Sequence, residues 1–491
     1  MILTQDFYLD IMVSSYIINS GGYMMENNKQ KGMFKSNFGF LMATIGSAVG
    51  LGNLWGFPYK MGNGGGFAFL VLYLIMAVCI GYSCMLGEFA IGRKTGKGVL
   101  SAYESIGKKF KFNGWFAALT PFFLMMFYCV LGGYCLKYLI ANFGDVVGAG
   151  WGVGDTPSAD YFGNFISDTS QAVILTLLFM ALTLGIVIMG VSSGVERFSV
   201  IAMPALFIML LIVVVRSVTL PGASEGLAFM FKPNFDVFKG TGWITVLGMA
   251  GGQLFFSLSL ASGCLIAYGS YLDKKENLER NAIIVPIADT TVAILAGLAT
   301  IPAVFSAGLE PAAGPGMLFI TLQTVFQGMG AGGHLFGTVF YLLVFLAALT
   351  SSIGMLEGSV SAFIDMRLEK GKTAGRTGIT LAIGAIACVG AIIVAADALG
   401  GGNLPHLFGF STWLDTFDLL AEGFLMPIGA LVMVIILGWI KPDFIDDEIK
   451  LSSSYSSKKF VHACLKFLAP VFMVFILVGQ MDSFFHLGIF N

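Results

Sequence analysis

The chain has 491 residues, of which 56% are hydrophobic and 11% are charged. Soluble domains carry about 25% charged residues, so this composition excludes a soluble globular protein. The formal net charge of −2 gives no basic excess for binding nucleic acid. The length leaves room for roughly ten or more membrane-spanning helices of about 20 residues each.

The first residues carry no clear targeting signal. Residues 1–22 are mildly apolar but lack the basic region and cleavage site of a signal peptide. Gly21 and Gly22 lie just before Met24 and Met25, and glycine codons at that distance can act as a ribosome-binding site. We expect residues 1–36 to be a cytoplasmic segment, and we hypothesise that translation starts at Met24 or Met25. The intact mass of natively expressed protein tests this hypothesis.

Hydropathy predicts an all-α integral membrane protein with about eleven transmembrane helices. The predicted spans cover residues 38–61, 67–91, 115–143, 169–190, 195–216, 243–270, 282–306, 337–366, 377–397, 415–440 and 460–484. Lys and Arg gather before the first span and after several even-numbered ones, whereas the loops at 144–168, 307–336 and 398–414 contain neither. This asymmetry predicts a cytoplasmic N-terminus and, with an odd number of spans, an outside C-terminus.

Glycines interrupt the first span. The run Ala48-Val49-Gly50-Leu51-Gly52 lies in its middle and is followed by Asn53. Glycine weakens helix continuity, and an unwound backbone is tolerated in lipid only where protein or water surrounds it. Glycines alone are equally compatible with a kinked helix that packs through small residues.

The sixth span contains a similar interruption from Ser257 to Gly263. Spans one and six hold matching places in two five-helix halves, residues 37–216 and 217–440, and residues 441–491 add a cytoplasmic loop and the eleventh helix. Because each half has an odd number of spans, the halves have opposite topology. We therefore predict a 5+5 inverted repeat with broken helices 1 and 6, the plan of secondary transporters.

Polar residues gather at four places within the predicted membrane. They are Asn53, the segment Gln253 to Ser259, Asp289, and the run Thr350-Ser351-Ser352. Polar groups at this depth are functional candidates, although isolated Ser and Thr often bond to their own helix. Together they supply amide, hydroxyl and carboxylate oxygens, the ligands that hard cations prefer. No His or Cys joins them, which argues against a transition metal.

Three strings in the chain carry a family resemblance. They are the glycine-broken first span, Phe255-Phe256-Ser257-Leu258-Ser259 and Leu349-Thr350-Ser351-Ser352. With them the chain resembles the neurotransmitter:sodium symporter family from about Phe34 to Asp482. The resemblance implies the leucine-transporter fold and sodium-coupled transport of amino acids or amines by alternating access.

The resemblance also implies two sodium sites. The first would comprise the Ala48 carbonyl, Asn53, Ser257, Asp289 and the carboxylate of the substrate. The second would comprise the carbonyls of Gly46, Val49 and Ala347 and the hydroxyls of Thr350 and Ser351. Because the substrate would complete the first site, each ligand would raise the affinity for the other.

The same resemblance implies a substrate site beside the broken helices. The carboxylate would meet backbone N–H groups near Leu51 and Gly52, where a helix N-terminus favours an anion, and the hydroxyl of Tyr128. The side chain of the substrate would face Leu124, Phe256, Ser259, Ser262 and Met355.

Ser262 indicates the size of the substrate. It stands where the leucine transporter of that family carries a Phe, and a smaller residue leaves room for a larger side chain. Met355 is adaptable and makes favourable contacts with aromatic rings. We hypothesise an aromatic or other large hydrophobic amino acid as substrate; the alternative is that neighbouring side chains repack and the pocket stays small.

Two departures from the family concern the outer gate and chloride. Many relatives carry an Arg where this chain has Gly56, and that Arg pairs with the acidic residue that Asp418 matches. Lys60 lies one helical turn after Gly56, and we expect it to pair with Asp418 in place of the Arg. The alternative is that both charges merely face the outer vestibule. Chloride-dependent relatives carry a Ser in place of Ala293, and Asp289 lies close enough in sequence to supply the negative charge. We therefore expect no chloride requirement.

The cytoplasmic gate and the oligomeric state follow from the same comparison. Lys31 and Phe34 match residues of the family's N-terminal gate, and Asp365 matches their acidic partner. The family most commonly has twelve spans, so dimer contacts that depend on the last one are in doubt. We expect a monomer or weak homo-oligomer in the inner membrane of a bacterium.

Other classes of function fit the sequence less well. An enzyme would need convergent acid and base groups, yet the histidines fall in loops or at chain ends and no nucleophile motif appears. A channel would need a continuous polar pore, whereas a pair of broken helices favours occlusion. A membrane sensor that binds an amino acid without net transport remains open.

Overall fold

The computed structural model describes residues 32–239, 242–309, 316–407, 409–485 and 487–488. Lys31, Met24 and Met25 precede these ranges, so the translation start and one half of the expected cytoplasmic gate lie outside the described residues. Within the described ranges every regular element is a helix, which confirms the predicted all-α class.

Nine continuous helical stretches of the described chain are long and apolar enough to cross a membrane, and the bent pair Asn37–Ala48 and Gly52–Asn63, at 47°, makes ten. The expected sixth span is absent from this count. It consists of α12 (Gly242–Ser257) and α13 (Cys264–Ser270), which residues 258–263 separate. Taken as the two halves of one broken span, they bring the number to the predicted eleven.

Several helices matter for the site that follows. They are α2 (Asn37–Ala48), η1 (Gly52–Gly56), α3 (Phe57–Asn63), α5 (Tyr82–Thr95), α6 (Val99–Ile106), α7 (Lys111–Val146), α8 (Ser158–Ser167), α9 (Thr169–Ile188), α10 (Arg197–Val218), α14 (Leu278–Ser306), η6 (Met317–Thr321), α15 (Leu322–Gly328), α16 (Gly333–Glu369), α17 (Arg376–Ala396), α18 (Trp413–Asp418) and η9 (Leu419–Leu425).

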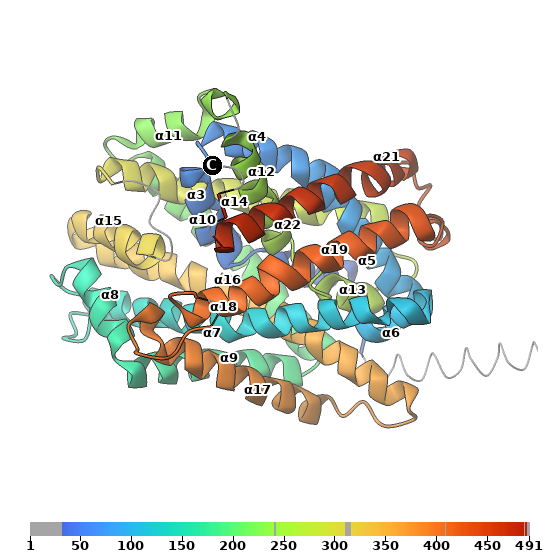
Figure 1. Ribbon diagram of the computed structural model, residues 1–491. Coiled ribbons are helices and arrows are strands. Elements are labelled where there is room, and N and C mark those ends of the chain that lie inside the picture. Colours follow the sequence, from blue (N-terminus) through green and yellow to red (C-terminus); the bar gives the residue numbers. More distant parts are fainter. Residues whose placement is uncertain (1–31, 240–241, 310–315, 408, 486, 489–491) are drawn as a thin grey trace, which may run out of the picture.

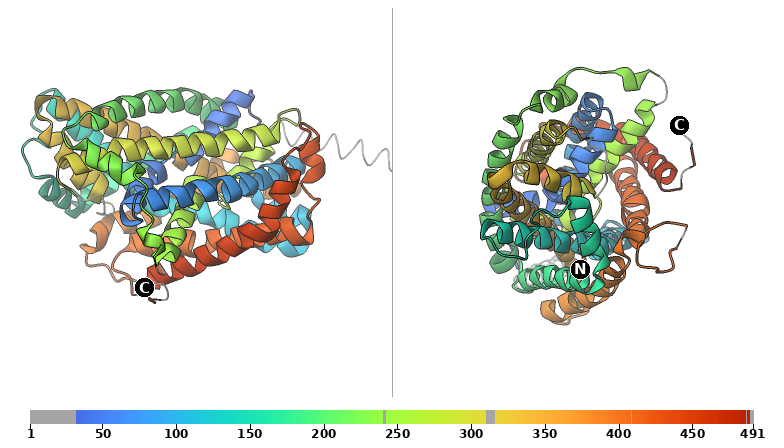
Figure 2. Two further views of the ribbon diagram at one scale, coloured as in Figure 1. Left: turned by 90° about the horizontal axis from the view of Figure 1, so that it is seen from above. Right: turned by 90° about the vertical axis from the view of Figure 1, so that its left-hand side faces the viewer.

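The broken helices lie inside the bundle. Most long helices run along one common axis (Figure 2), and α7 packs against α9, α16 and α17. Against this group, α2 contacts α10, α14 and α16, and α13 contacts α5 and α16 (Figure 1). The interruptions in the sequence therefore occur where neighbouring helices shield the exposed backbone from lipid.

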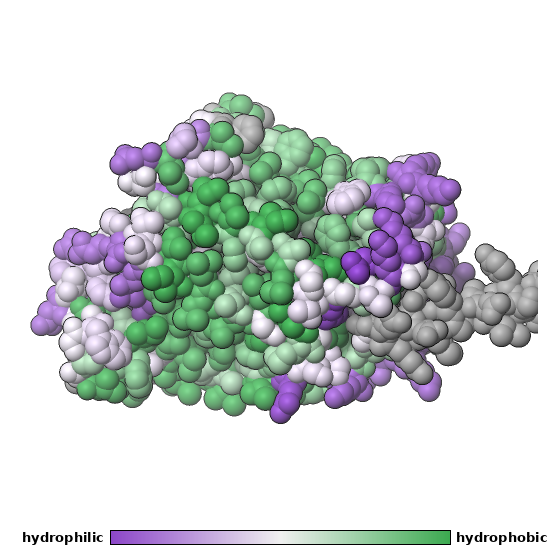
Figure 3. All heavy atoms as spheres, turned by 90° about the horizontal axis from the view of Figure 1, so that it is seen from below, coloured by the Kyte–Doolittle hydropathy of each residue, from purple (hydrophilic) through white to green (hydrophobic). Residues whose placement is uncertain are grey.

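The outer surface is suited to a bilayer. Large apolar side chains face outward along the bundle, among them Ile201, Val215 and Ile287, each at least 60% exposed. Figure 3 shows this apolar surface as a broad band, with hydrophilic residues gathered toward its two ends. Such a band would be unstable in water, so the surface supports the predicted multi-pass membrane protein.

Candidate functional site

The first helix breaks where the glycines predict. α2 ends at Ala48, Val49 adopts an extended conformation (φ −74°, ψ 105°), and the chain resumes as the π-helical turn η1. A Cβ atom added to Gly50 would lie 2.3 Å from Ser351 Oγ and 2.5 Å from the Tyr128 hydroxyl. Only glycine lets the backbone approach both side chains so closely.

The second break spans residues 258–263 and is more distorted. Ser259 and Ala261 have positive φ angles of 52° and 57°, and Gly263 has 77°. Positive φ is uncommon for residues other than glycine and clusters at functional sites. The segment is held from outside, because Ser259 Oγ donates to the Ser47 carbonyl at 3.2 Å and Glu88 accepts from the Ala261 N–H at 2.7 Å. Glu88 of α5 thus accepts a hydrogen bond from the second break.

Asp289 on α14 joins the two breaks. Its carboxylate accepts hydrogen bonds from Asn53 Nδ2 at 2.8 Å, from Ser257 Oγ at 2.9 and 3.1 Å, and from the Tyr73 hydroxyl at 3.4 Å. All four side chains are fully buried. No ion pair to Asp289 occurs among the described residues, and a buried carboxylate without a cation is costly. The cluster therefore has the charge and the oxygen atoms to hold a small cation.

A second oxygen cluster lies between α2 and α16. Ser351 Oγ is 3.2 Å from both the Gly46 and the Val49 carbonyl oxygens, while Thr350 Oγ1 is 3.0 Å from the Ala347 carbonyl oxygen. The two hydroxyls and the three carbonyls belong to residues that are all buried. These are the five residues that the sequence assigns to a second sodium site, and the fold brings them together from two helices.

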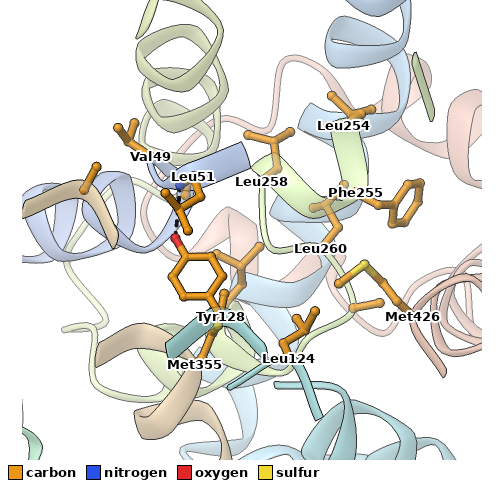
Figure 4. Close-up of a cluster of buried hydrophobic side chains, with 14 of the residues drawn as sticks. Val49, Leu51, Leu124, Tyr128, Leu254, Phe255, Leu258, Leu260, Met355 and Met426 are labelled. Carbon is orange, nitrogen blue, oxygen red and sulfur yellow. Dashed lines mark hydrogen bonds between the residues drawn. The ribbon is translucent and has the colours of Figure 1, made fainter. Parts of the chain in front are cut away.

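The expected substrate residues surround the first break. The Leu51 N–H donates to the Tyr128 hydroxyl at 3.0 Å, and Figure 4 shows Tyr128 pointing at this backbone with Leu124 and Met355 near its ring. The rings of Tyr128 and Phe256 lie 6.4 Å apart, edge to face. A Cβ atom on Gly52 would come within 2.9 Å of Phe256 Cδ1.

Ser262 lies in the second break and is 1% exposed. Its hydroxyl donates to the Ser259 carbonyl at 2.6 Å, so it turns back onto its own segment. Ala48, at the end of α2, is also buried beside this region.

At the expected outer gate the charges do not meet directly. The described residues contain no ion pair between Lys60 and Asp418, although the charge of Lys60 acts on both Asp418 and Glu422. Glu422 lies one helical turn beyond Asp418, and Asp418 Oδ1 is buried with no hydrogen-bond partner among the described residues. The sequence reading missed Glu422, for which the one signal was its i, i+4 spacing from Asp418. Gly56 stands where many relatives carry an Arg, and it packs against Gln253. A Cβ atom added to Gly56 would lie 2.9 Å from Gln253 Oε1.

Aromatic rings pack together at the end of the bundle that carries Phe34. Phe34 contacts the rings of Phe40, Tyr268 and Tyr271 at 5.5, 5.6 and 6.2 Å, and its N–H donates to the Tyr271 carbonyl at 3.3 Å. Asp365 accepts a hydrogen bond from the Gly98 N–H at the loop before α6. The N-terminal segment thus packs on the end of α13, where the sequence predicts a gate.

Paired breaks at mid-bundle, two oxygen clusters beside them and an apolar outer band define a secondary transporter. A model of the Sodium:neurotransmitter symporter family matches residues 31–153 and 164–490. The chain belongs to this family, and it is a sodium-dependent transporter rather than an enzyme.

Relatives along nearly the full length agree with this assignment. An uncharacterized sodium-dependent transporter of Bacillus subtilis, YhdH, is 34% identical over 90% of this chain and 96% of its own length. An uncharacterized sodium-dependent transporter of Haemophilus influenzae is 33% identical over 93% of this chain and 100% of its own. The crystal structure of MhsT in complex with L-phenylalanine matches with a TM-score of 0.82 at 33% identity, covering 91% of this chain and 99% of MhsT.

Proposed function

We propose that this protein is a symporter that uses the sodium gradient to carry an aromatic amino acid into a bacterial cell by alternating access. The observation that carries the proposal is the Asp289 cluster, which draws one residue from each broken helix onto a single buried carboxylate. A cation bound there would hold the two breaks together, so ion binding and helix arrangement would depend on each other.

The coupling of sodium to substrate rests on a shared ligand. In the proposed first site a sodium ion contacts the Ala48 carbonyl, Asn53, Ser257, Asp289 and the carboxylate of the amino acid. The second sodium ion binds between Gly46, Val49, Ala347, Thr350 and Ser351. Binding free energies are reciprocal, so sodium in the first site raises affinity for the amino acid by the factor by which the amino acid raises affinity for sodium.

The substrate carboxylate would lie against the backbone of the first break near Leu51 and Gly52. Tyr128 accepts from the Leu51 N–H, which leaves its own hydroxyl hydrogen to donate to that carboxylate. The side chain would extend toward Leu124, Phe256, Ser259, Ser262 and Met355. The small Ser262 and the L-phenylalanine complex of MhsT support an aromatic substrate.

Further parts of the proposal concern the ions and the topology. Asp289 supplies a fixed negative charge, so transport needs no chloride. Residues 37–216 and 217–440 form the two inverted repeats, the N-terminus faces the cytoplasm and the C-terminus faces outside. Lys60 with Asp418 forms the outer gate, Lys31 with Asp365 forms the inner gate, and the protein works as a monomer or weak homo-oligomer.

Binding to purified protein tests the substrate class. Labelled phenylalanine, tyrosine, tryptophan, leucine and alanine are compared in sodium and in potassium buffers. We expect sodium-dependent binding that aromatic amino acids compete away and that alanine does not. The assignment of an aromatic substrate would be wrong if leucine or alanine displaced the bound label and aromatic amino acids did not.

A further inference from the structure

The carboxylate of Asp397 has no role in the sites described above. Asp397 directly follows α17 and is 1% exposed. A negative charge is unfavourable at a helix C-terminus, because the negative end of the helix dipole lies there, and burial adds to that cost. An acid in this place therefore needs strong hydrogen-bond donors, and the structure supplies two.

Each oxygen of the carboxylate has one donor. Asp397 Oδ1 accepts from His406 Nε2 at 2.7 Å, and Asp397 Oδ2 accepts from the Trp413 N–H at 2.9 Å. His406 is the only basic residue in the sequence from 398 to 414, and Trp413 is the first residue of α18. We call these three residues the Asp397 staple. The staple joins the end of α17, the loop that follows and the start of α18.

The loop between α17 and α18 is strained beside the staple. It lies at the end of the bundle that carries α8 (Figure 1). Ala398 and Leu399 have positive φ angles of 48° and 52°, and a Cβ atom on Gly400 would lie 2.5 Å from the Ser411 carbonyl oxygen. The two ends of the loop therefore lie against each other. Strained residues of this kind persist only where surrounding contacts enforce them, and the staple is such a contact.

Ring contacts lead from the staple toward the proposed substrate site. The rings of Trp413 and Phe417 lie 5.8 Å apart, and Phe417 stacks on Phe123 of α7 at 6.3 Å. Phe123 precedes Leu124, which is proposed to face the substrate. Asp418, which is proposed for the outer gate, follows Phe417 on α18. The position of the first residue of α18 therefore sets where Phe417 and Asp418 lie relative to α7.

We propose that Asp397 is a positioning residue of the transport cycle: with His406 it fixes the first turn of α18, so that Phe417 and Asp418 meet α7 in one position. The role in the cycle rests on the transport function proposed above, whereas the fixing of α18 does not. A helix that is already fixed costs less to order when the substrate is enclosed. A loosened α18 would hold the binding-competent position for only part of the time, and the apparent affinity would fall by that fraction.

Hydrogen–deuterium exchange of peptides covering residues 411–420 tests the staple in the full-length protein. We compare wild type with Asp397→Leu, His406→Leu and the double variant. Asp397→Leu leaves the Trp413 N–H without its acceptor and should speed exchange of α18 by about tenfold, while peptides of α10 stay unchanged. His406→Leu should act less strongly in the same direction. Because both changes act through one carboxylate, the double variant should match Asp397→Leu. Unchanged exchange, or strictly additive effects, would overturn the staple.

His406→Gln and Asp155→Asn are the matched controls. A Gln side chain can donate from its amide nitrogen to Asp397 in place of the imidazole, so exchange should return close to that of wild type. Asp155 is exposed in the loop before α8, and no partner of its side chain occurs in the described part of the chain. Asp155→Asn removes one negative charge from the same end of the bundle and should match wild type. If Asp397→Leu fails to fold, His406→Leu carries the test, with faster exchange as the expected result and equal exchange as the contrary one.

Binding of labelled phenylalanine to purified protein in sodium buffer tests the role in the cycle. A loosened α18 should raise the dissociation constant of Asp397→Leu by about fivefold and leave the number of binding sites unchanged. A loss of folded protein would instead lower the number of sites at an unchanged dissociation constant, and that result would overturn the positioning role. If wild type binds no phenylalanine, the proposed aromatic substrate fails, whereas the exchange results still decide whether the staple fixes α18.

Discussion

Asp289 is the residue on which the proposed coupling depends most. Three neutral side chains, Asn53 of η1, Tyr73 and Ser257 of α12, donate hydrogen bonds to its carboxylate. They orient the carboxylate without neutralising its charge. A buried anion in this setting attracts a cation strongly, because the protein interior screens charge less than water does. The same charge is our reason for expecting transport without chloride.

Replacing Asp289 with Asn tests the role of that charge. The amide keeps the size and one oxygen of the side chain but removes its charge, so sodium-driven uptake in gluconate buffer should fall by about tenfold or more. Chloride should restore part of the rate in the variant while leaving wild type unchanged. The measurement is initial uptake in matched gluconate and chloride buffers. A wild type that needs chloride, or a variant with full activity in gluconate, would contradict the account.

Ser262→Phe tests the origin of substrate size. Ser262 is fully packed in the second break, so a phenyl group there has to take volume from the proposed pocket. We expect affinity to shift from tryptophan toward leucine by about tenfold or more, read as the ratio of their inhibition constants. The ratio is insensitive to expression level. An unchanged ratio would mean that Ser262 does not face the substrate.

At the scale of single elements, the two broken helices show what the sequence predicts and what it does not. The first break was located by Gly50 and Gly52, and the second by the Ser-rich run that ends at Gly263. The positive φ angles of Ser259 and Ala261 have no local signal, because hydrogen bonds to the distant residues Ser47 and Glu88 hold them. The π-helical turn η1 is likewise tied to a distant residue, since Asn53 donates to Asp289. Glu422 was missed because Lys60, the basic residue whose charge acts on it, lies far along the chain.

Gly50→Ala tests the close approach at the first break. The added methyl group would collide with Ser351 Oγ and the Tyr128 hydroxyl, which belong to the second oxygen cluster and to the proposed substrate site. Overpacking of this kind costs about 1–3 kcal/mol, so sodium and substrate affinity should both fall by about tenfold. Gly185→Ala on α9 is the matched control, because its Cβ would meet nothing within 4 Å. Equal affinities in the two variants would show that Gly50 is not tightly packed in the working protein.

At the scale of the whole molecule, the structure shows a transporter closed toward the end that carries Phe34. The aromatic contacts of Phe34 with Tyr268 and Tyr271 join the chain before α2 to the end of α13, so the halves of both broken helices at this end are held together. Hydropathy and composition alone predicted the membrane fold. They did not predict which side is closed, because that depends on small differences in free energy between states of one sequence.

Gradient-driven accumulation is the most direct test of sodium-coupled amino-acid transport by this protein. Purified protein is reconstituted in liposomes, and uptake of labelled tyrosine, tryptophan and phenylalanine is followed with an inward sodium gradient and again after the gradient is dissipated. We expect accumulation above the outside concentration that collapses when the gradient is removed. Sodium-dependent binding without accumulation would contradict it and would indicate a sensor.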